Sequence, residues 1–173
     1  MTEPTLAARL AERCWVTGEF MIRSGHTATS YFDKFRFTAD PELLAEVAEA
    51  LVPLVPDSAD ALAGLELGGV PIATALSLAT GLPAVFVRKE AKAYGTAKLA
   101  EGGDIVGRRL VIIEDVISTG GQVAISALAL RDLGALVDVA VCVVDRSTGN
   151  HVALDEADVA LRSLFTAFDV PPR

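Results

Sequence analysis

The segment with the clearest chemical character runs from Leu110 to Gln122 and reads LVIIEDVISTGGQ. An apolar run is followed by two adjacent acids, Glu114 and Asp115, and then by a turn rich in hydroxyl groups and glycine. Carboxylates accept hydrogen bonds from sugar hydroxyls. The backbone amides of a glycine-rich turn can surround an anion. These residue types in this order are suited to binding a phosphorylated sugar.

Such a site needs a strand and a helix to position it. The four apolar residues Leu110–Ile113 predict a strand that is buried on both faces, as in the middle of a parallel sheet. The acids then lie at the carboxyl end of this strand, where open α/β sheets bind their ligands. The apolar pattern from Val123 to Leu133 predicts a helix whose N-terminus faces the turn and favours a phosphate there.

The stretch VIIEDVISTGGQ resembles the phosphoribosyl pyrophosphate (PRPP) signature of type I phosphoribosyltransferases. The resemblance implies that Glu114 and Asp115 hold the ribose hydroxyls. It also implies that the following residues bind the 5-phosphate, namely Val116, Ile117, Ser118, Thr119, Gly120, Gly121 and Gln122. The alternative interpretation is a buried strand with two solvated acids and a tight turn.

A basic segment lies upstream of this signature. Between Arg88 and Ala100 there are four basic residues and one acidic residue, although the chain has a net charge of −8. The sequence RKEAK at 88–92, with the loop that follows, resembles orotate phosphoribosyltransferases; a solvated surface loop is the alternative. In that family the loop, here about 89–108, is mobile, closes over the site and binds pyrophosphate. The resemblance assigns PRPP contacts to Arg88, Lys89, Lys92 and Tyr94, and catalytic roles to Lys89, Lys92, Glu114 and Asp115.

The resemblance also implies an assembly, because the loop arginine of the family reaches into the neighbouring subunit's site. We therefore expect a homodimer in which Arg88 serves the partner's active site. Tyr94 stands where many relatives carry a histidine. The turn Glu66–Gly69 stands where the family binds pyrophosphate through backbone amides, so Leu67 and Gly68 are further expected PRPP contacts. This turn has no lysine, in contrast to some relatives.

Weaker matches lie near the ends of the chain. Arg23, after the apolar Ile22, resembles a basic residue that reaches PRPP from a small N-terminal hood. Tyr31 and Phe32 resemble an aromatic pair that lies against the base. Arg146, after Asp145, resembles an arginine that meets the orotate carboxylate, and Ser118 is expected beside it. Alone, such an aromatic pair or a strand-terminal arginine is more commonly a packing or solvated feature.

Composition agrees with a compact enzyme. The 173 residues, 51% of them hydrophobic, suit a single domain 1–173 with its hood at about 1–38. A pI near 4.7 argues against nucleic acid or an anionic membrane as a partner. No apolar run reaches the roughly 18 residues of a membrane span, and 1–16 does not resemble a signal peptide. Cys14 and Cys142 are expected to be buried, reduced thiols, which favours a cytoplasmic protein.

The expected fold class is α/β: the type I phosphoribosyltransferase fold, with a mainly parallel sheet flanked by helices and a small N-terminal hood. Leu6, Leu10 and Cys14 share one face of an opening helix, and Asp40–Pro41 predicts the start of another. The expected helices are that opening helix and 40–55, 70–79, 123–133 and 154–158. The expected strands are 20–22, 31–35, 62–67, 84–87, 110–113 and 137–144, with 89–108 as a long loop.

Other chemistries fit the sequence less well. It contains neither a P-loop nor a G-x-G-x-x-G turn. Ser118, Asp145 and His151 follow the order of an α/β-hydrolase triad, but the serine lacks the G-x-S-x-G elbow. Neither His26 nor His151 has another histidine or a cysteine at zinc-ligand spacing in the sequence. Mg²⁺ is expected without dedicated ligands, since it binds mainly through substrate phosphates.

The resemblance therefore implies an Mg²⁺-dependent orotate phosphoribosyltransferase, a glycosyltransferase of UMP biosynthesis. It would transfer the 5-phosphoribosyl group from PRPP to orotate and form orotidine 5-monophosphate and pyrophosphate. Two alternatives stay open. One is a type I phosphoribosyltransferase for another nucleobase, and the other is a regulator that senses PRPP without catalysis.

Overall fold

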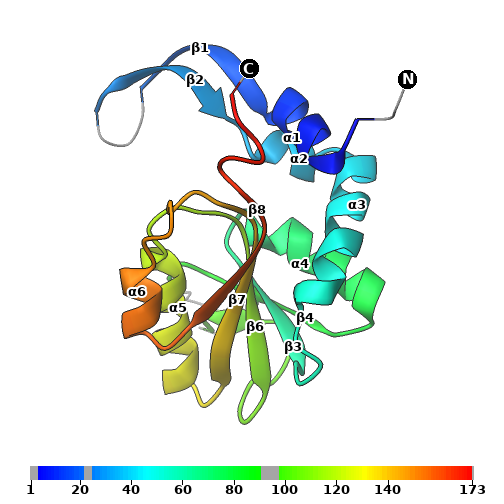
Figure 1. Ribbon diagram of the computed structural model, residues 1–173. Coiled ribbons are helices and arrows are strands. Elements are labelled where there is room, and N and C mark those ends of the chain that lie inside the picture. Colours follow the sequence, from blue (N-terminus) through cyan, green and yellow to red (C-terminus); the bar gives the residue numbers. More distant parts are fainter. Residues whose placement is uncertain (1–3, 22–24, 91–97, 173) are drawn as a thin grey trace.

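The computed structural model describes residues 4–21, 25–90 and 98–172. It contains a six-stranded sheet of order β5-β4-β3-β6-β7-β8 and a separate two-stranded sheet, β1-β2 (Figure 1). The strands are β1 Trp15–Met21, β2 Thr27–Phe32, β3 Ala61–Leu65, β4 Ala84–Val87, β5 Ala100–Glu101, β6 Arg109–Ile117, β7 Leu136–Asp145 and β8 Ala160–Thr166. The helices are α1 Leu6–Cys14, α2 Phe35–Thr38, α3 Pro41–Leu51, α4 Gly69–Thr80, α5 Gly121–Asp132 and α6 Val152–Glu156, with a 3₁₀ turn at Val52–Leu54.

The large sheet is parallel apart from one short edge strand. β4, β3, β6, β7 and β8 pair in parallel, with Ala63 opposite Ile112 at the centre, whereas β5 pairs antiparallel to β4. Helices α4 and α5 connect parallel strands, as such crossovers require. The expected α/β class with a mainly parallel sheet is confirmed.

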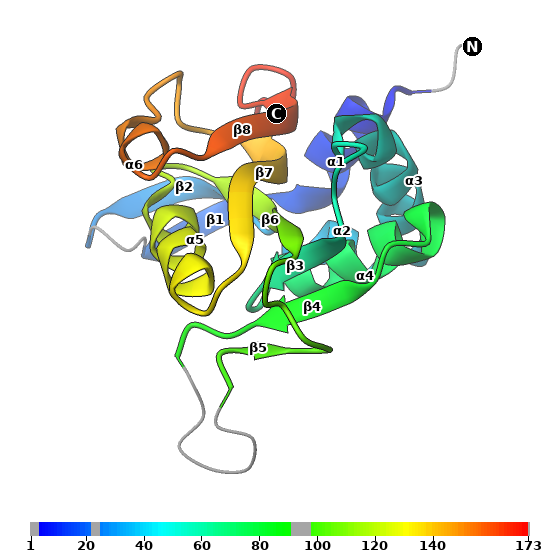
Figure 2. The same ribbon diagram turned by 90° about the horizontal axis from the view of Figure 1, so that it is seen from below.

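Helices cover both faces of this sheet. Helices α3 and α4 lie over one face and α5 and α6 over the other, as Figures 1 and 2 show. Buried side chains form two hydrophobic cores. In the central strand β6, Val111 and Ile113 belong to one core, and Leu110 and Ile112 belong to the other. This alternation confirms that the apolar run before the acids is buried on both faces.

The N-terminal hairpin β1-β2 stands apart from the sheet, and the C-terminal segment passes beside it (Figure 1). The indole Nε1 of Trp15 donates to the carbonyl oxygen of Val170 at 2.9 Å and joins the two. Strands were expected at 20–22 and 31–35, but they start earlier, and Phe35 begins a helix. Asp33 explains this change, because its carboxylate accepts a hydrogen bond from the amide of Phe35 and turns the chain.

Two helix predictions are confirmed, with small changes in length. In α1, Leu10 and Cys14 are buried, and both cysteines of the chain are buried free thiols. In α3, the carboxylate of Asp40 accepts from the amide of Leu43 at 3.3 Å, and Pro41 is the first helical residue. The helix ends at Leu51 rather than near 55, because the chain tightens into a 3₁₀ turn.

Three expectations about strands were wrong. Strand β6 continues to Ile117, because residues 114–117 pair with β7, so the acids lie within the strand. The segment expected to be a loop at 89–108 contains β5 and the buried Ile105. Strand β8 was missed, since its ALRSLFT sequence mixes polar and apolar residues, as an edge strand can. Across the described ranges, we find no helix with the length and hydrophobicity to cross a membrane.

Candidate active site

Strand β6 carries the two acids to the carboxyl end of the sheet. Asp115 is fully buried, whereas Glu114 is partly exposed and lines a cavity of about 160 Å³. The other residues around this cavity are Val116, Ile117, Ser118, Thr119, Gly120, Gly121, Gln122 and Val123. The structure thus gathers Glu114 and the whole predicted phosphate loop around one cavity.

The carboxylate of Asp115 is enclosed by three groups. Its Oδ1 accepts from the amide of Val116 at 2.6 Å. Gly68 packs against it so closely that a β-carbon at residue 68 would lie 1.6 Å from Oδ2. The third group is the ammonium of Lys34, whose Nζ lies 2.9 Å from Oδ2 and 3.0 Å from Oδ1. A buried carboxylate needs such partners to remain ionised.

Glu114 has a different environment. Burial, followed by the charge of Asp115 and a hydrogen bond between the two side chains, raises the pKa of Glu114 to about 8. Its Oε2 also accepts from the amide of Asp115 at 3.0 Å. Glu114 therefore keeps its proton near neutral pH, because like charges in a buried site oppose each other.

The phosphate loop owes its shape to Gly120. This residue has a φ of +73°, and a β-carbon there would lie 2.6 Å from Cγ of Leu154. Helix α5 begins at Gly121, so the first amides of the helix, which have no intrahelical acceptor, adjoin the cavity. Together with the helix dipole, these amides favour a phosphate.

The turn after β3 approaches the same strand end. A β-carbon on Gly69 would lie 2.1 Å from the carbonyl oxygen of Ile113, so only glycine allows this contact. Leu67 is 62% exposed, and the Glu66–Leu67 peptide bond is cis. The carboxylate of Glu66 accepts from the amide of Lys89 at 3.2 Å, which joins this turn to the start of the basic loop.

Arg88 lies near that turn but not in the phosphate cavity. It lines a separate cavity of about 290 Å³ together with Glu66 and Leu67, and its Nε lies 3.8 Å from Oε1 of Glu101. The other predicted PRPP contacts, Arg23, Lys92 and Tyr94, lie outside the described residues.

The base-side residues are only partly brought together. The amide of Arg146 donates to the carbonyl oxygen of Ile117 at 2.7 Å, which places Arg146 beside the start of the phosphate loop. Its guanidinium lies 5.6 Å from the ring centroid of Trp15. Tyr31 is 45% exposed, but Phe32 is only 6% exposed and packs edge-on against Trp15. Adjacent strand residues face opposite sides, so we correct the expected pair: Tyr31 is at the surface and Phe32 belongs to the core.

Sequence reasoning missed Lys34 and Trp15. Each follows an ordinary local pattern, and neither lies in a motif that marks a site. Their contacts, to Asp115 and Arg146, span more than eighty residues of the chain and depend on how the hairpin is placed over the sheet. Only the position of Lys34 directly after the YFD segment gave a weak signal.

The alternative triad is not assembled around Ser118. The Nε2 atom of His151 lies 3.4 Å from Oδ2 of Asp145, and the serine that it contacts, also at 3.4 Å, is Ser147. A single nitrogen atom faces both groups, so the ring cannot relay a proton between them as a hydrolase triad does.

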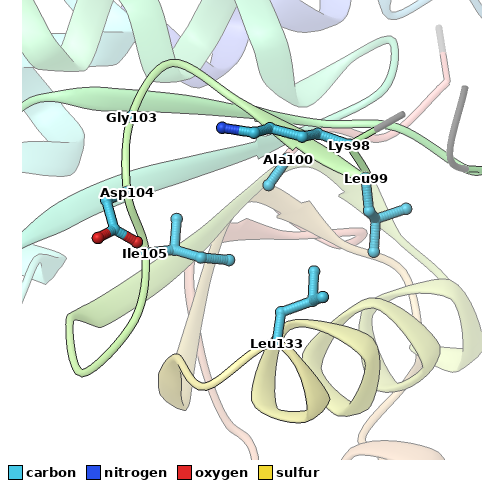
Figure 3. A pocket seen from close by; sticks show the side chains of 7 residues that line it. All are labelled: Lys98, Leu99, Ala100, Gly103, Asp104, Ile105 and Leu133. Atoms are coloured by element: carbon cyan, nitrogen blue, oxygen red, sulfur yellow. The ribbon is translucent and has the colours of Figure 1, made fainter. Parts of the chain in front are cut away.

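A larger cavity of about 560 Å³ lies away from the acids. The cavity lies between the segment 98–105 and the end of α5. Leu99, Ile105 and Leu133 face it, with Lys98 and Asp104 at its edges (Figure 3). It shares no lining residue with the phosphate cavity, so size alone does not locate the reactive site.

The family model of the phosphoribosyl transferase domain matches residues 36–161, which include strands β3 to β7 and both acids. Fold and site thus define a phosphoribosyltransferase, an enzyme of the pentosyltransferase class. A curated orotate phosphoribosyltransferase of a Nocardioides species is 54% identical over 95% of this chain and 92% of its own length. The chain therefore belongs to the orotate phosphoribosyltransferase family of pyrimidine biosynthesis.

Solved structures agree. Orotate phosphoribosyltransferase of Mycobacterium tuberculosis in complex with Fe(III) dicitrate has a TM-score of 0.85 and 33% identity, covering 95% of this chain and 96% of that one. The same enzyme in complex with PRPP has a TM-score of 0.80 and 28% identity, with the same coverage.

Proposed function

We propose that this protein transfers the 5-phosphoribosyl group from PRPP to orotate, forming orotidine 5-monophosphate and pyrophosphate. The observation that carries the proposal is the arrangement at the end of β6. There Asp115, Glu114 and the glycine loop before α5 lie within one short segment, and Arg146 is hydrogen-bonded to it. Carboxylates for ribose, amides for phosphate and a guanidinium for a carboxylate are the groups that these two substrates require.

The reaction breaks the bond between C1 of the ribose and the pyrophosphate oxygen, and a ring nitrogen of orotate bonds to C1. Positive charge develops on the ribose as pyrophosphate leaves. Asp115 and Glu114 hold the ribose hydroxyls and lie near this charge, while Lys89, Lys92 and Arg88 neutralise the leaving group. Positioning the two substrates supplies a large part of the rate.

Recognition of the base falls to Arg146, Ser118 and Tyr31. Arginine pairs with a carboxylate through two parallel hydrogen bonds, and an exposed tyrosine ring offers a flat surface for a pyrimidine. The backbone contact of Arg146 with Ile117 supports this role, because it places the residue beside the start of the phosphate loop.

Mg²⁺ is the expected cofactor. Residues 4–21, 25–90 and 98–172 hold no group of three or more His, Cys, Asp or Glu side chains placed to bind a metal. This suits a hard cation that is carried to the site by substrate oxygens and needs no dedicated protein cage. When bound, Mg²⁺ supplies charge neutralisation for the pyrophosphate.

We further propose a cytoplasmic homodimer of single-domain chains, with the N-terminal hairpin as the hood and Arg88 serving the partner's site. Support comes from the cavities, because Arg88 lines one that is separate from the phosphate cavity of its own chain. An arginine of a neighbouring chain could complete the latter.

A base panel tests the proposal against the alternatives. The purified protein is incubated with PRPP, Mg²⁺ and orotate, uracil, adenine or hypoxanthine, and nucleotide formation is followed by chromatography. Turnover of orotate alone is expected. Turnover of another base would identify a different phosphoribosyltransferase, and PRPP binding without turnover of any base would identify a regulator.

A further inference from the structure

Lys34 places an ammonium group directly on the most buried acid of the site. Its Nζ lies within 3.0 Å of both carboxylate oxygens of Asp115. The lysine side chain is 33% exposed, whereas that of Asp115 is fully buried. The pair joins the turn after β2 to strand β6, two parts of the chain that are 81 residues apart.

The backbone on each side of this pair is fixed. Before Lys34, the amide of Asp33 donates to the carbonyl oxygen of Cys14 at 2.8 Å, and the Asp33 carboxylate accepts from the amide of Phe35. Asp115 is held in strand β6 and by the amide of Val116. The lysine side chain between them remains the flexible part, since it has several rotatable bonds.

This arrangement closes the carboxylate to a substrate. A ribose hydroxyl must come within hydrogen-bond distance of an oxygen of Asp115, yet that side chain has no exposed surface. Gly68 covers it with backbone atoms, which cannot rotate away. Lys34 covers it with a partly exposed side chain, which can.

We propose that Lys34 is a gate on the ribose subsite: its ammonium occupies the Asp115 carboxylate in the empty protein and is exchanged for ribose hydroxyls when substrate binds. This inference rests on the proposed function, because it requires Asp115 to bind ribose. Lys34 is thereby a positioning residue that holds the carboxylate in place until the sugar arrives.

The exchange has a thermodynamic consequence. A contact that exists only in the empty state opposes binding, because the ligand must break it. Removing the ammonium should therefore strengthen ribose binding. It should also lower the stability of the empty protein, because it leaves a buried carboxylate without its counter-ion. A purely structural role for Lys34 predicts lower stability together with unchanged or weaker binding.

Calorimetric titration with ribose 5-phosphate separates these roles, since this probe has the hydroxyls and the 5-phosphate but no pyrophosphate. Lys34→Met is expected to bind it at least roughly fivefold more tightly than the unaltered protein, because fivefold corresponds to an exposed ion pair and the carboxylate here is buried. Arg9→Met is the matched control. Arg9 has a similar exposure and pairs with Glu46 between α1 and α3, away from the acids. It should lower the melting temperature without changing affinity.

Thermal unfolding gives a second readout. Lys34→Met should melt at a lower temperature when empty, yet gain more from saturating ribose 5-phosphate than the unaltered protein does. If Lys34→Met does not fold, Lys34→Gln, which keeps one amide donor without the charge, is measured in the same way.

The two failures are distinguishable. If the unaltered protein binds ribose 5-phosphate but the Lys34 variant binds it equally or less tightly, the gate is refuted and the proposed function stands. If the unaltered protein neither binds ribose 5-phosphate nor turns over PRPP, the proposed function fails, and the gate fails with it.

Discussion

Gly68 and the carboxylate of Asp115 are in direct contact, so that a β-carbon on residue 68 would lie 1.6 Å from Oδ2. The φ of Gly68 is −68°, which any residue adopts easily. Glycine is therefore required here for space and not for backbone conformation. The predicted pyrophosphate turn and the predicted ribose acid thus form one packed unit.

Gly68→Ala should disable the enzyme without unfolding it. The added methyl group must displace either the turn or the acid, and a shift of about 1 Å in a reacting group can cost roughly a hundredfold in rate. We expect kcat/KM for PRPP to fall by about that factor. Gly81→Ala is the control: it strains a residue with a φ of +76° in open space, so stability should fall by roughly 1 kcal/mol with normal kinetics. Normal kinetics for Gly68→Ala would show that a methyl group can be accommodated between residue 68 and Asp115 without displacing the acid.

Activity should rise with pH through the titration of Glu114. The raised pKa, about 8, means that the empty enzyme near neutral pH carries Glu114 mainly in its protonated form. A carboxylate accepts ribose hydroxyls better than a carboxylic acid does. We therefore expect kcat/KM for PRPP, which reports the free enzyme, to increase as pH approaches and passes 8. Glu114→Gln should remove this rise, and a Gln variant with an unchanged profile would assign the titration to another group.

The raised pKa of Glu114 should also make the folded protein less stable as pH rises, whereas activity increases. Because the folded protein holds a proton on Glu114 that the unfolded chain releases above about pH 4.5, folding takes up a proton between that value and about 8. The contribution of this group to stability therefore declines as pH rises through that window. Urea unfolding at several pH values should show a shallower decline for Glu114→Gln than for the unaltered protein.

Arg146→Ala should affect one substrate far more than the other. Loss of the guanidinium leaves the orotate carboxylate without its partner, so KM for orotate should rise by tenfold or more. KM for PRPP should stay within a few-fold, because the acids and phosphate loop keep their strand pairing. Arg162→Ala, at an arginine of β8 that donates to the carbonyl oxygen of Leu54, is the control and should change neither constant. Equal losses for both substrates would mean that Arg146 supports the fold through Trp15.

The assignment of Arg88 to the partner's site predicts complementation between two inactive variants. In a heterodimer of Arg88→Ala and Asp115→Asn chains, one site combines the intact Asp115 of the first chain with the intact Arg88 of the second. Mixing the two proteins should restore activity as subunits exchange. Verified exchange without recovered activity would place Arg88 in the site of its own chain.

The sequence predicted the sheet well because its central strands are buried on both faces. The run Leu110–Ile113 is fully buried and lies within β6, and the predicted strand 84–87 matches β4, in which Val85 and Val87 are buried although Phe86 is exposed. The strands that were missed, β5 and β8, lie at the two edges of the sheet. Strand β8 is an edge strand whose ALRSLFT sequence has no regular alternation of polar and apolar residues, and β5 has only two residues.

The site divides in the same way. Motif residues that lie close together in the chain, namely Glu114 and the loop to Gln122, surround one cavity. Residues that reach the site from the hairpin were mistaken or missed. Phe32 packs in the core, and Lys34 pairs with Asp115. Both outcomes depend on the orientation of the hairpin. This orientation is set by long-range contacts such as that of Trp15 with Val170, which no local sequence pattern encodes.

The central claim is that Asp115 holds the ribose while charge develops on it. The most direct test is kcat/KM for PRPP in Asp115→Asn, with Asp138→Asn as the control, since Asp138 pairs with Arg109 at the other end of the parallel strands. Loss of a charged hydrogen bond in the transition state is commonly worth about 2–4 kcal/mol. We therefore expect a fall of roughly thirtyfold to a thousandfold for Asp115→Asn and near-normal kinetics for the control. A value for Asp115→Asn within a few-fold of the unaltered enzyme would contradict the account.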